Sequence, residues 1–231
     1  TEDWVQITAV AAGYAHTLAL MEDGHVLATG NNSYNQCDVG NWSNVTAICC
    51  GPWDSYAIRA DGSLLHCGFT SLPNLSGWTN VVALNAGDAS LAAVRQGGTL
   101  LASLPGIGKE WRDLCAACPI DRNIAALKKD GTLLCDGRDF SGWTDVIAID
   151  SSASLLVGLR SDGTLLVEPL LPVNKALLSA LASEEHVIGF SLAGTYALLL
   201  HEDGSLTAPG APDEIQAFLR EPNEGLNLFF R

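Results

Sequence analysis

One unit recurs six times along the chain, and this recurrence restricts it to folds built from copies of one structural unit. Positions are counted from the first residue of each copy, which is position zero. Five copies begin with tryptophan, and in all six a two-residue turn begins at position nineteen. The copies start at Trp4, Trp42, Trp78, Trp111, Trp143 and Glu184, and their turns are Asp23-Gly24, Asp61-Gly62, Gly97-Gly98, Asp130-Gly131, Asp162-Gly163 and Asp203-Gly204. The starts lie 32 to 41 residues apart, although the first nineteen positions keep one length, as in rigid units joined by variable connectors.

Each copy carries three apolar runs with the composition of β-strands. Positions three and six are apolar and position five is small throughout, and further runs cover positions thirteen to sixteen and the residues after the turn. Asp-Gly between two such runs favours a tight hairpin. Strands that are apolar almost throughout need sheets covered on both faces. The sequence therefore predicts an all-β fold, a β-propeller of six short repeats with blades of three to four antiparallel strands.

The copies resemble the repeat of the regulator-of-chromosome-condensation family, in the short bacterial form found in the secreted β-lactamase-inhibitor propeller. The residues that carry the likeness are 10–20, Asp23-Gly24, 26–30, Asn31-Asn32 and Gln36. The resemblance implies a propeller and extends over all six copies, but not over 168–183 and 209–224. Copies four to six depart from it at position nine, where Ile120, Ser152 and Ala193 replace the glycine that the family prefers.

We expect residues 1–231 to form a single propeller domain and a monomer, with two short helical connectors. One covers 173–183, where three leucines share a face, and the other covers 213–221, which opens with acidic residues. Each helix is either a connector packed on the rim or a docking element. Residues 226–230 resemble the first strand of a seventh copy. Either they close the ring, or the chain stops inside a longer array, so six and seven blades both stay open.

The charge balance bears on the class of partner. The formal net charge is −14, from 26 acidic and 12 basic residues, and no cluster of Lys or Arg occurs. Binding to a phosphate backbone needs the opposite charge, so we expect no nucleic-acid partner. The acidic surface either attracts a basic partner or serves solubility alone. No apolar run is long enough to span a bilayer, and we expect no membrane partner.

The seven cysteines form no disulfide framework. Cys115 and Cys118 make a CxxC pattern, but they occupy strand positions where other copies carry unrelated residues, which favours packed thiols over a zinc site. We expect no metal and no cofactor. Free thiols indicate a reducing compartment, and the chain is assigned to the cytoplasm, with secretion as the alternative if a leader has been removed.

Nothing in the sequence predicts an enzyme. The five histidines fall at five different positions of the repeat, which scatters them, and no phosphate-binding glycine loop, HExxH or GxSxG motif is present. We expect a non-catalytic propeller that binds a protein. The alternatives are a regulatory or structural module of a larger polypeptide and an enzyme with an unrecognised site.

The loops at positions nine to twelve vary while the strands do not, so they are the predicted binding face. The resemblance implies the same face, since this loop set grips the partner in the β-lactamase-inhibitor relative, with aromatic residues prominent. The predicted partner-binding residues are Tyr14, His16, Trp53, Asp54, Asp88 and Tyr196. The alternative is that Trp53 caps its own blade and Tyr56 packs inward. The tryptophans at position zero and the turn aspartates are expected to be structural.

Overall fold

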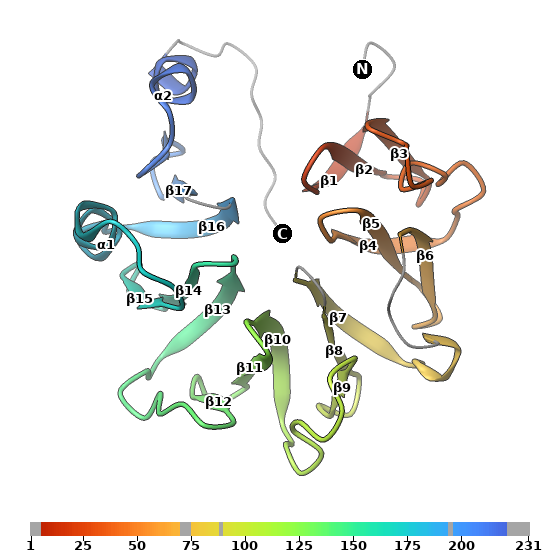
Figure 1. Ribbon diagram of the computed structural model, residues 1–231, viewed down its shortest axis with the longest axis horizontal. Helices are drawn as coiled ribbons and strands as arrows, with labels where there is room; N and C mark the ends of the chain where they lie inside the picture. Colours follow the sequence, from red (N-terminus) through yellow and green to blue (C-terminus); the bar gives the residue numbers. More distant parts are fainter. Residues whose placement is uncertain (1–5, 70–74, 88–89, 194–195, 221–231) are drawn as a thin grey trace. The chain divides into compact units, whose positions relative to one another are not determined.

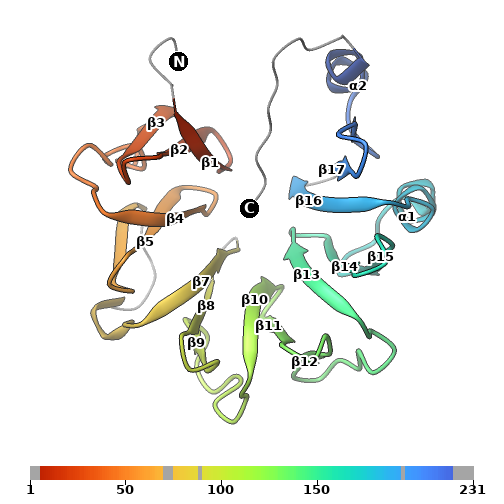
Figure 2. The ribbon, with the colours of Figure 1, turned by 180° about the vertical axis from the view of Figure 1, so that it is seen from behind.

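The computed structural model describes residues 6–69, 75–87, 90–193 and 196–220. In these residues eighteen strands form six three-stranded sheets, each made of three strands consecutive in the chain (Figures 1 and 2). The sheets are β1–β3 (Ile7–Ala12, His16–Met21, Val26–Gly30), β4–β6 (Val45–Cys50, Asp54–Arg59, Leu64–Gly68), β7–β9 (Val81–Ala86, Leu91–Arg95, Leu100–Ala102), β10–β12 (Leu114–Ile120, Asn123–Lys128, Leu133–Cys135), β13–β15 (Val146–Ser151, Leu155–Arg160, Leu165–Pro169) and β16–β18 (Val187–Ala193, Tyr196–His201, Leu206–Thr207). The three-stranded form is thus the one observed, and the nearly all-β class is confirmed.

The described residues divide into two compact units, 6–124 and 125–220. In the first unit β4 packs against β1 and β2, and β7 packs against β4 and β5, so successive sheets stack face to face. The middle strands of the first five sheets are buried over most of their length, as in Leu155–Arg160, whereas in the sixth only Ala197 and Leu199 of β17 are buried. These are the doubly covered strands that the continuous apolar runs predicted.

The small residue at position five marks a bulge in the first strand of the sheet. Pairing of β1 with β2 shifts between Ile7 and Ala9, and the same shift recurs between Val45 and Ala47 in β4. The first strands of three further sheets, β7, β13 and β16, carry it as well. A bulge turns the position-four side chain outward and bends the strand. Exposed Val82 and Ile147 are two such residues.

A backbone hydrogen bond also links consecutive copies, just before the bulge, and the sequence analysis did not predict it. The residue at position two has a positive φ in every copy, and it is Asn44 in the second. This left-handed residue directs the next amide to the hairpin of the preceding copy, so Val45 N–H donates to the carbonyl of Gly24 at 3.0 Å. Asn and Asp tolerate the left-handed region better than other non-glycine residues. The same amide-to-glycine bond is made by Val81, Leu114, Val146 and Val187.

The position-zero tryptophans fill space between sheets, as expected. Trp42 is 4% exposed and lies in a cluster with Leu18 of the first sheet and Ala57 of the second. Trp78 packs in the same way between the second and third sheets, against Ile58 and Ala93. In these two copies a large aromatic residue at position zero thus fills the space between adjacent sheets. Trp4 lies outside the described residues.

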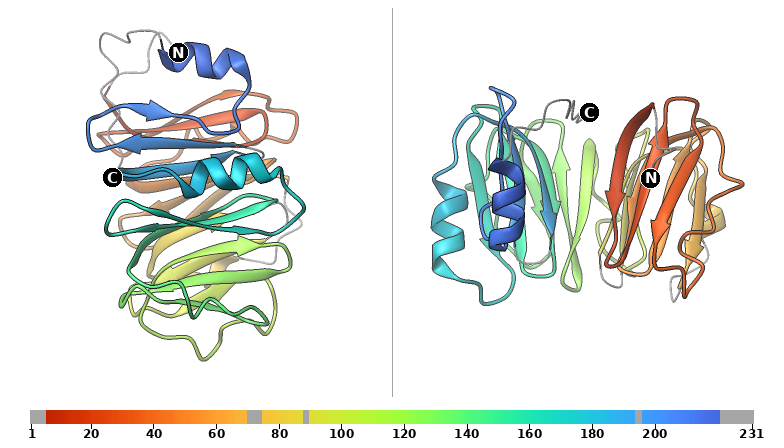
Figure 3. Two further views of the ribbon diagram at one scale, coloured as in Figure 1. Left: turned by 90° about the vertical axis from the view of Figure 1, so that its left-hand side faces the viewer. Right: turned by 90° about the horizontal axis from the view of Figure 1, so that it is seen from above.

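Both predicted helices are present in the second unit. α1 (Lys175–Ala182) is capped by the Asn174 side chain, which accepts a hydrogen bond from Ala176 N–H at 2.9 Å. Its Leu177 and Leu181 are buried among residues of the fifth and sixth sheets, and Figure 3 shows α1 lying along the strands. This burial supports the packed-connector interpretation of 173–183.

The second helix, α2 (Asp213–Arg220), carries Asp213 and Glu214 in its first turn, where carboxylates oppose the helix dipole favourably. Within the described ranges, neither helix is long and apolar enough to cross a bilayer. Residues 226–230 lie outside these ranges. A single domain closed by that strand, and the choice between six and seven blades in the whole chain, stay predictions.

Candidate protein-binding face

Tyr14 and Trp53 meet at the loop end of the first two sheets. Tyr14 lies between β1 and β2 and is 78% exposed, and Trp53 lies between β4 and β5 and is half-buried. Their ring centroids are 5.0 Å apart at an interplanar angle of 47°. The Tyr14 amide also donates to the carbonyl of Pro52 at 3.2 Å, so backbone as well as rings hold the two loops together. Two predicted site residues from different copies are therefore neighbours.

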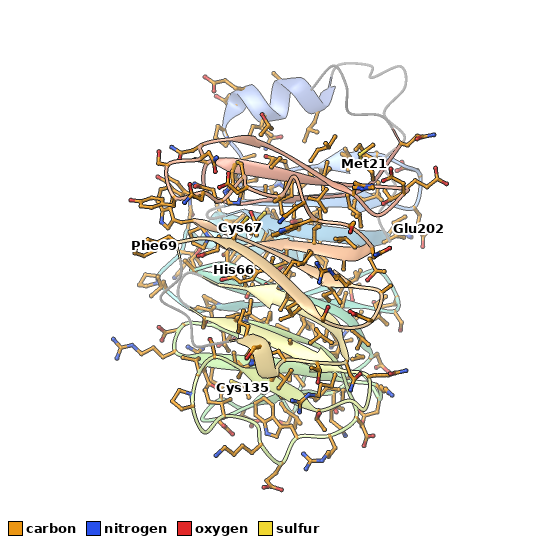
Figure 4. The ribbon with its side chains drawn as sticks, turned by 90° about the vertical axis from the view of Figure 1, so that its right-hand side faces the viewer. Met21, His66, Cys67, Phe69, Cys135 and Glu202 are labelled. Carbon is orange, nitrogen blue, oxygen red and sulfur yellow. The ribbon has the colours of Figure 1, made fainter. Side chains whose placement is uncertain are left out.

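Two further aromatic side chains extend this pair, and sequence reasoning missed both. The Tyr34 centroid is 5.6 Å from that of Trp53 and 5.2 Å from that of Phe69, both with edge-to-face geometry. Tyr34 is 45% exposed and Phe69 is 55% exposed. Figure 4 shows Phe69 at the edge of the first unit, at the end opposite Met21. Tyr14, Trp53, Tyr34 and Phe69 are called the aromatic row below.

Two glycines with positive φ end the third strands of the first two sheets beneath the row. Gly68 ends β6 with a φ of +122°, and a Cβ there would lie 2.5 Å from the carbonyl oxygen of Trp53. That approach lets the Phe69 amide donate to the same carbonyl at 3.1 Å, which sets Phe69 beside the row. Gly30 makes the equivalent approach in the first sheet, to the carbonyl of Ala15.

The loop that carries Tyr34 is held by a buried amide. Gln36 is fully buried, and its Oε1 accepts a hydrogen bond from the Tyr34 amide at 2.9 Å. Its Nε2 donates to Asn31 Oδ1 at 3.3 Å. A buried side-chain amide satisfied on both sides fixes a loop that has no regular secondary structure. Gln36 therefore positions Tyr34 against Trp53.

His16 supports the row from below. It is 3% exposed, and its Nε2 lies 3.0 Å from Ser55 Oγ, whose hydroxyl donates to the Gln36 carbonyl at 2.7 Å. Because the Ser55 hydroxyl proton is donated to Gln36, Ser55 Oγ must accept the proton of His16 Nε2–H. The neutral ring then carries no proton on Nδ1, which has no hydrogen-bond partner. Burial lowers the pKa of His16 below its ordinary value. The structure thus places His16 under the predicted face, between the first two sheets.

Asp54 is largely withdrawn from the surface. Its carboxylate lies 3.1 Å from His66 Nε2, and both side chains are mostly buried. The His66 ring centroid is 4.8 Å from that of Tyr56, which is 1% exposed. The inward packing of Tyr56 matches the alternative interpretation of this loop, whereas Trp53 contacts Tyr14 of the neighbouring copy and so does more than cap its own sheet.

The two remaining predicted residues lie outside the described part of the first unit, so their place in the face stays a prediction. Asp88 lies outside the described residues. Tyr196 belongs to the second unit, where it opens β17 and is half-buried. The first unit therefore brings together Tyr14 and Trp53 at the surface, with His16 and Asp54 below them.

The groups around the row are poorly suited to nucleophilic chemistry. Ser55 and His16 resemble a nucleophile and its base, but Ser55 is fully buried and its proton is committed to a carbonyl. Burial raises the pKa of the Cys67 thiol to about 11, which keeps it protonated at neutral pH. The described residues contain no group of three or more His, Cys, Asp or Glu placed to hold a metal ion.

The CxxC cysteines separate in the strand. Cys118 is fully buried, as expected of a packed thiol. Cys115 is exposed, and the prediction that it packs is wrong. The physical reason is its place in the repeat: Cys115 occupies position four of its copy, the position at which Val82 and Ile147 are also exposed.

The turn aspartates are hairpin residues, as predicted. The Asp162 carboxylate accepts hydrogen bonds from the Thr164 hydroxyl at 2.6 Å and from the Thr164 amide at 3.0 Å. These bonds, that of the hydroxyl most of all, hold the pKa of Asp162 below its ordinary value. The equivalent amide bonds are made at Asp23, Asp61, Asp130 and Asp203.

Comparison with known proteins identifies the repeat and the fold. The model of the regulator of chromosome condensation (RCC1) repeat matches residues 7–36. Prp20p from Saccharomyces cerevisiae, studied for its binding to Gsp1p and histones, superposes with a TM-score of 0.64 at 13% identity, over 90% of this chain and 72% of that one. The same yeast protein bound to Kap60 gives 0.67 at 14% identity, over 90% and 70%.

A plant receptor shows the same architecture. The CRINKLY WD40 ectodomain of the Arabidopsis thaliana receptor kinase ACR4 superposes with a TM-score of 0.68 at 12% identity, over 89% of this chain and 81% of that one. The predicted RCC1-like repeat and β-propeller are therefore confirmed, with the six three-stranded sheets as blades. These matches do not bear on the short bacterial form, which stays a prediction.

Proposed function

We propose that this chain, an RCC1-like propeller, is a non-catalytic protein-binding module and that the aromatic row is its contact face. The observation that carries the proposal is the row itself. Four aromatic side chains from four loop segments contact one another in sequence at the surface of the first unit, and three of them are exposed. Tyrosine and tryptophan are the residues most often dominant in protein interfaces.

The supports beneath the row favour binding over chemistry. Rings held by Gln36, Gly68 and the Tyr14 amide lose little side-chain freedom when a partner arrives, which favours affinity. Exposed aromatic clusters without a partner are unusual on monomeric proteins. The yeast relative is itself known with protein partners, namely Gsp1p, histones and Kap60.

A pulldown from the cells that make this chain tests the proposal. Beads carrying the wild type are compared with beads carrying Tyr14→Ala/Trp53→Ala. The matched control is Ile147→Ala/Ile188→Ala, which also removes two exposed apolar side chains, 58% and 53% exposed, but from the second unit. We expect the first variant to lose its partner while the control keeps it, with all three proteins melting within a few degrees of one another.

Each ring at the centre of an interface contributes about 2 kcal/mol or more, so the double variant should bind at least about a hundredfold more weakly. Equal recovery of the partner by wild type and by a folded Tyr14→Ala/Trp53→Ala protein would show that the row is not the contact face.

A further inference from the structure

The charges in the first two sheets are almost all negative. Residues 6–69 contain five carboxylates and a single arginine, a difference of 1 − 5 = −4. The carboxylates are those of Glu22, Asp23, Asp38, Asp54 and Asp61. Glu22, Asp23 and Asp61 lie in the hairpin turns at the end of the strands away from the row, whereas Asp38 and Asp54 lie at the end that carries it. No Lys or Arg precedes Arg59. The segment that builds the aromatic row is thus more one-sided in charge than the chain as a whole.

The single arginine lies far from the row. Arg59 ends β5, whereas Asp54 at the start of β5 adjoins Trp53. Five residues of extended strand separate them by about 16 Å. The next cation at the loop end of the first unit is Arg122, between β10 and β11, and the whole third sheet intervenes. No cationic side chain of the first two sheets therefore competes for the faces of the row.

Two carboxylates lie next to the row in the chain. Asp38 is exposed in the loop of Tyr34, where Asn32 Nδ2 donates to its Oδ1 at 3.0 Å. Asp54 follows Trp53 directly, and its carboxylate faces His66. A positive group approaching the row meets ring faces with a negative quadrupole and the exposed Asp38 carboxylate, with no Lys or Arg of these two sheets beside it.

We propose that the aromatic row binds a basic segment of its protein partner by taking an arginine side chain against the rings of Trp53 and its neighbours. This deepens the proposed function and rests on it. Guanidinium stacks on aromatic faces and sheds water more readily than an ammonium group, so arginine is preferred over lysine. Aromatic rows also bind proline-rich segments, but that mode needs no positive charge and leaves the local charge excess unused.

Fluorescence anisotropy with labelled peptides tests the proposal on the full chain. The probes have equal length, with glycine and serine separating arginines, lysines or citrullines, and a proline-rich PxxP peptide is the fourth. Citrulline keeps the shape of arginine without its charge. We expect the arginine peptide to bind most tightly, the lysine peptide more weakly, and the citrulline peptide about tenfold or more below arginine. Raising the salt from about 50 to about 500 mM should weaken the arginine complex severalfold.

Variants assign the effect to the row. Trp53→Ala should abolish arginine binding, and Asp38→Asn should weaken it about twofold, while Ile147→Ala should leave it unchanged. Equal affinity for arginine and citrulline peptides, tighter binding of the PxxP peptide, or no binding of any probe overturns the basic-segment proposal. The pulldown with Tyr14→Ala/Trp53→Ala reads the proposed function separately, because it does not depend on which chemistry the partner presents.

Discussion

His16 shows how a single side chain links the two sheets that carry the row. Its ring bridges from β2 to Ser55 of β5, and its Nδ1 is buried without a hydrogen-bond partner, so burial outweighs the opposing effect of Asp54 on its pKa. Neutral histidine therefore fits this position and imidazolium does not. The face above it depends on that protonation state through the Ser55 and Gln36 contacts.

This arrangement predicts a loss of stability in mild acid. The folded pKa of His16 is lowered, so as the pH falls through about 6.5 the unfolded chain takes up the proton and the folded protein does not. The free energy of unfolding contributed by neutral His16 is fully present above pH 6.5 and decreases below it, by at most about 1.4 kcal/mol per pH unit.

Urea unfolding between about pH 7.5 and 5.5 measures the effect. His16→Gln should flatten the profile, whereas His25→Gln, at an exposed turn, should leave it as in the wild type. Identical pH profiles for wild type and His16→Gln would contradict the assignment.

Gly68 makes a second prediction at this scale. A methyl group there must occupy a left-handed backbone position and meet the Trp53 carbonyl, so Gly68→Ala should lower the free energy of unfolding by about 1 to 3 kcal/mol. Gly40→Ala is the matched control, because a Cβ at Gly40 meets nothing within 4 Å. Thermal melts of both variants decide the matter, and equal melting temperatures would rule the strain out.

At the scale of elements, α1 distinguishes a connector from a docking helix. A docking helix keeps an apolar face available to a partner, but Leu181 is fully buried with Val157 and Leu199 of the adjoining sheets. The helix thus completes the core of the second unit, much as Trp42 and Trp78 fill the space between adjacent sheets of the first.

Leu181→Ala should therefore cost the protein about 2 to 5 kcal/mol of stability. Leu171→Ala removes the same atoms from a side chain that is 54% exposed, and it should change stability by less than about 1 kcal/mol. Denaturant titrations of the two variants provide the measurement. If both variants lost equally little free energy of unfolding, α1 would be only loosely held and available to a partner.

At the scale of the whole molecule, the features that could be predicted were those that repeat. Asp162 and its counterparts form their turns through bonds to residues two positions away, so a short motif suffices to specify them. The tryptophan seams and the small residue at position five follow from the same spacing. The left-handed residue at position two could also have been predicted, because four copies carry Asn or Asp there. The recurrent small residue at position five likewise indicated the bulge.

The row could be only half predicted, because half of it does not repeat. Tyr34 reaches Trp53 through a loop that Gln36 holds, and only the first copy has such a loop. Phe69 could have been predicted, because it follows Gly68 in the same way that Asn31 follows the equivalent Gly30. A large aromatic residue at a position where the first copy carries asparagine is a signal that the sequence analysis overlooked. Burial of His16 depends on a serine 39 residues away, which no local pattern reveals.

The amide-to-glycine bond between consecutive copies has a consequence for how such a chain can be rebuilt. It joins main-chain atoms alone, Val45 N–H to the Gly24 carbonyl and its counterparts, so this bond does not itself require particular side chains in either copy. Any copy that keeps a left-handed residue at position two and a glycine in its hairpin offers the same two connectors. Copies joined at these points can be exchanged where the residues that pack between adjacent sheets, such as Trp42 and Trp78, are kept, so new recognition loops can be installed on an unchanged frame.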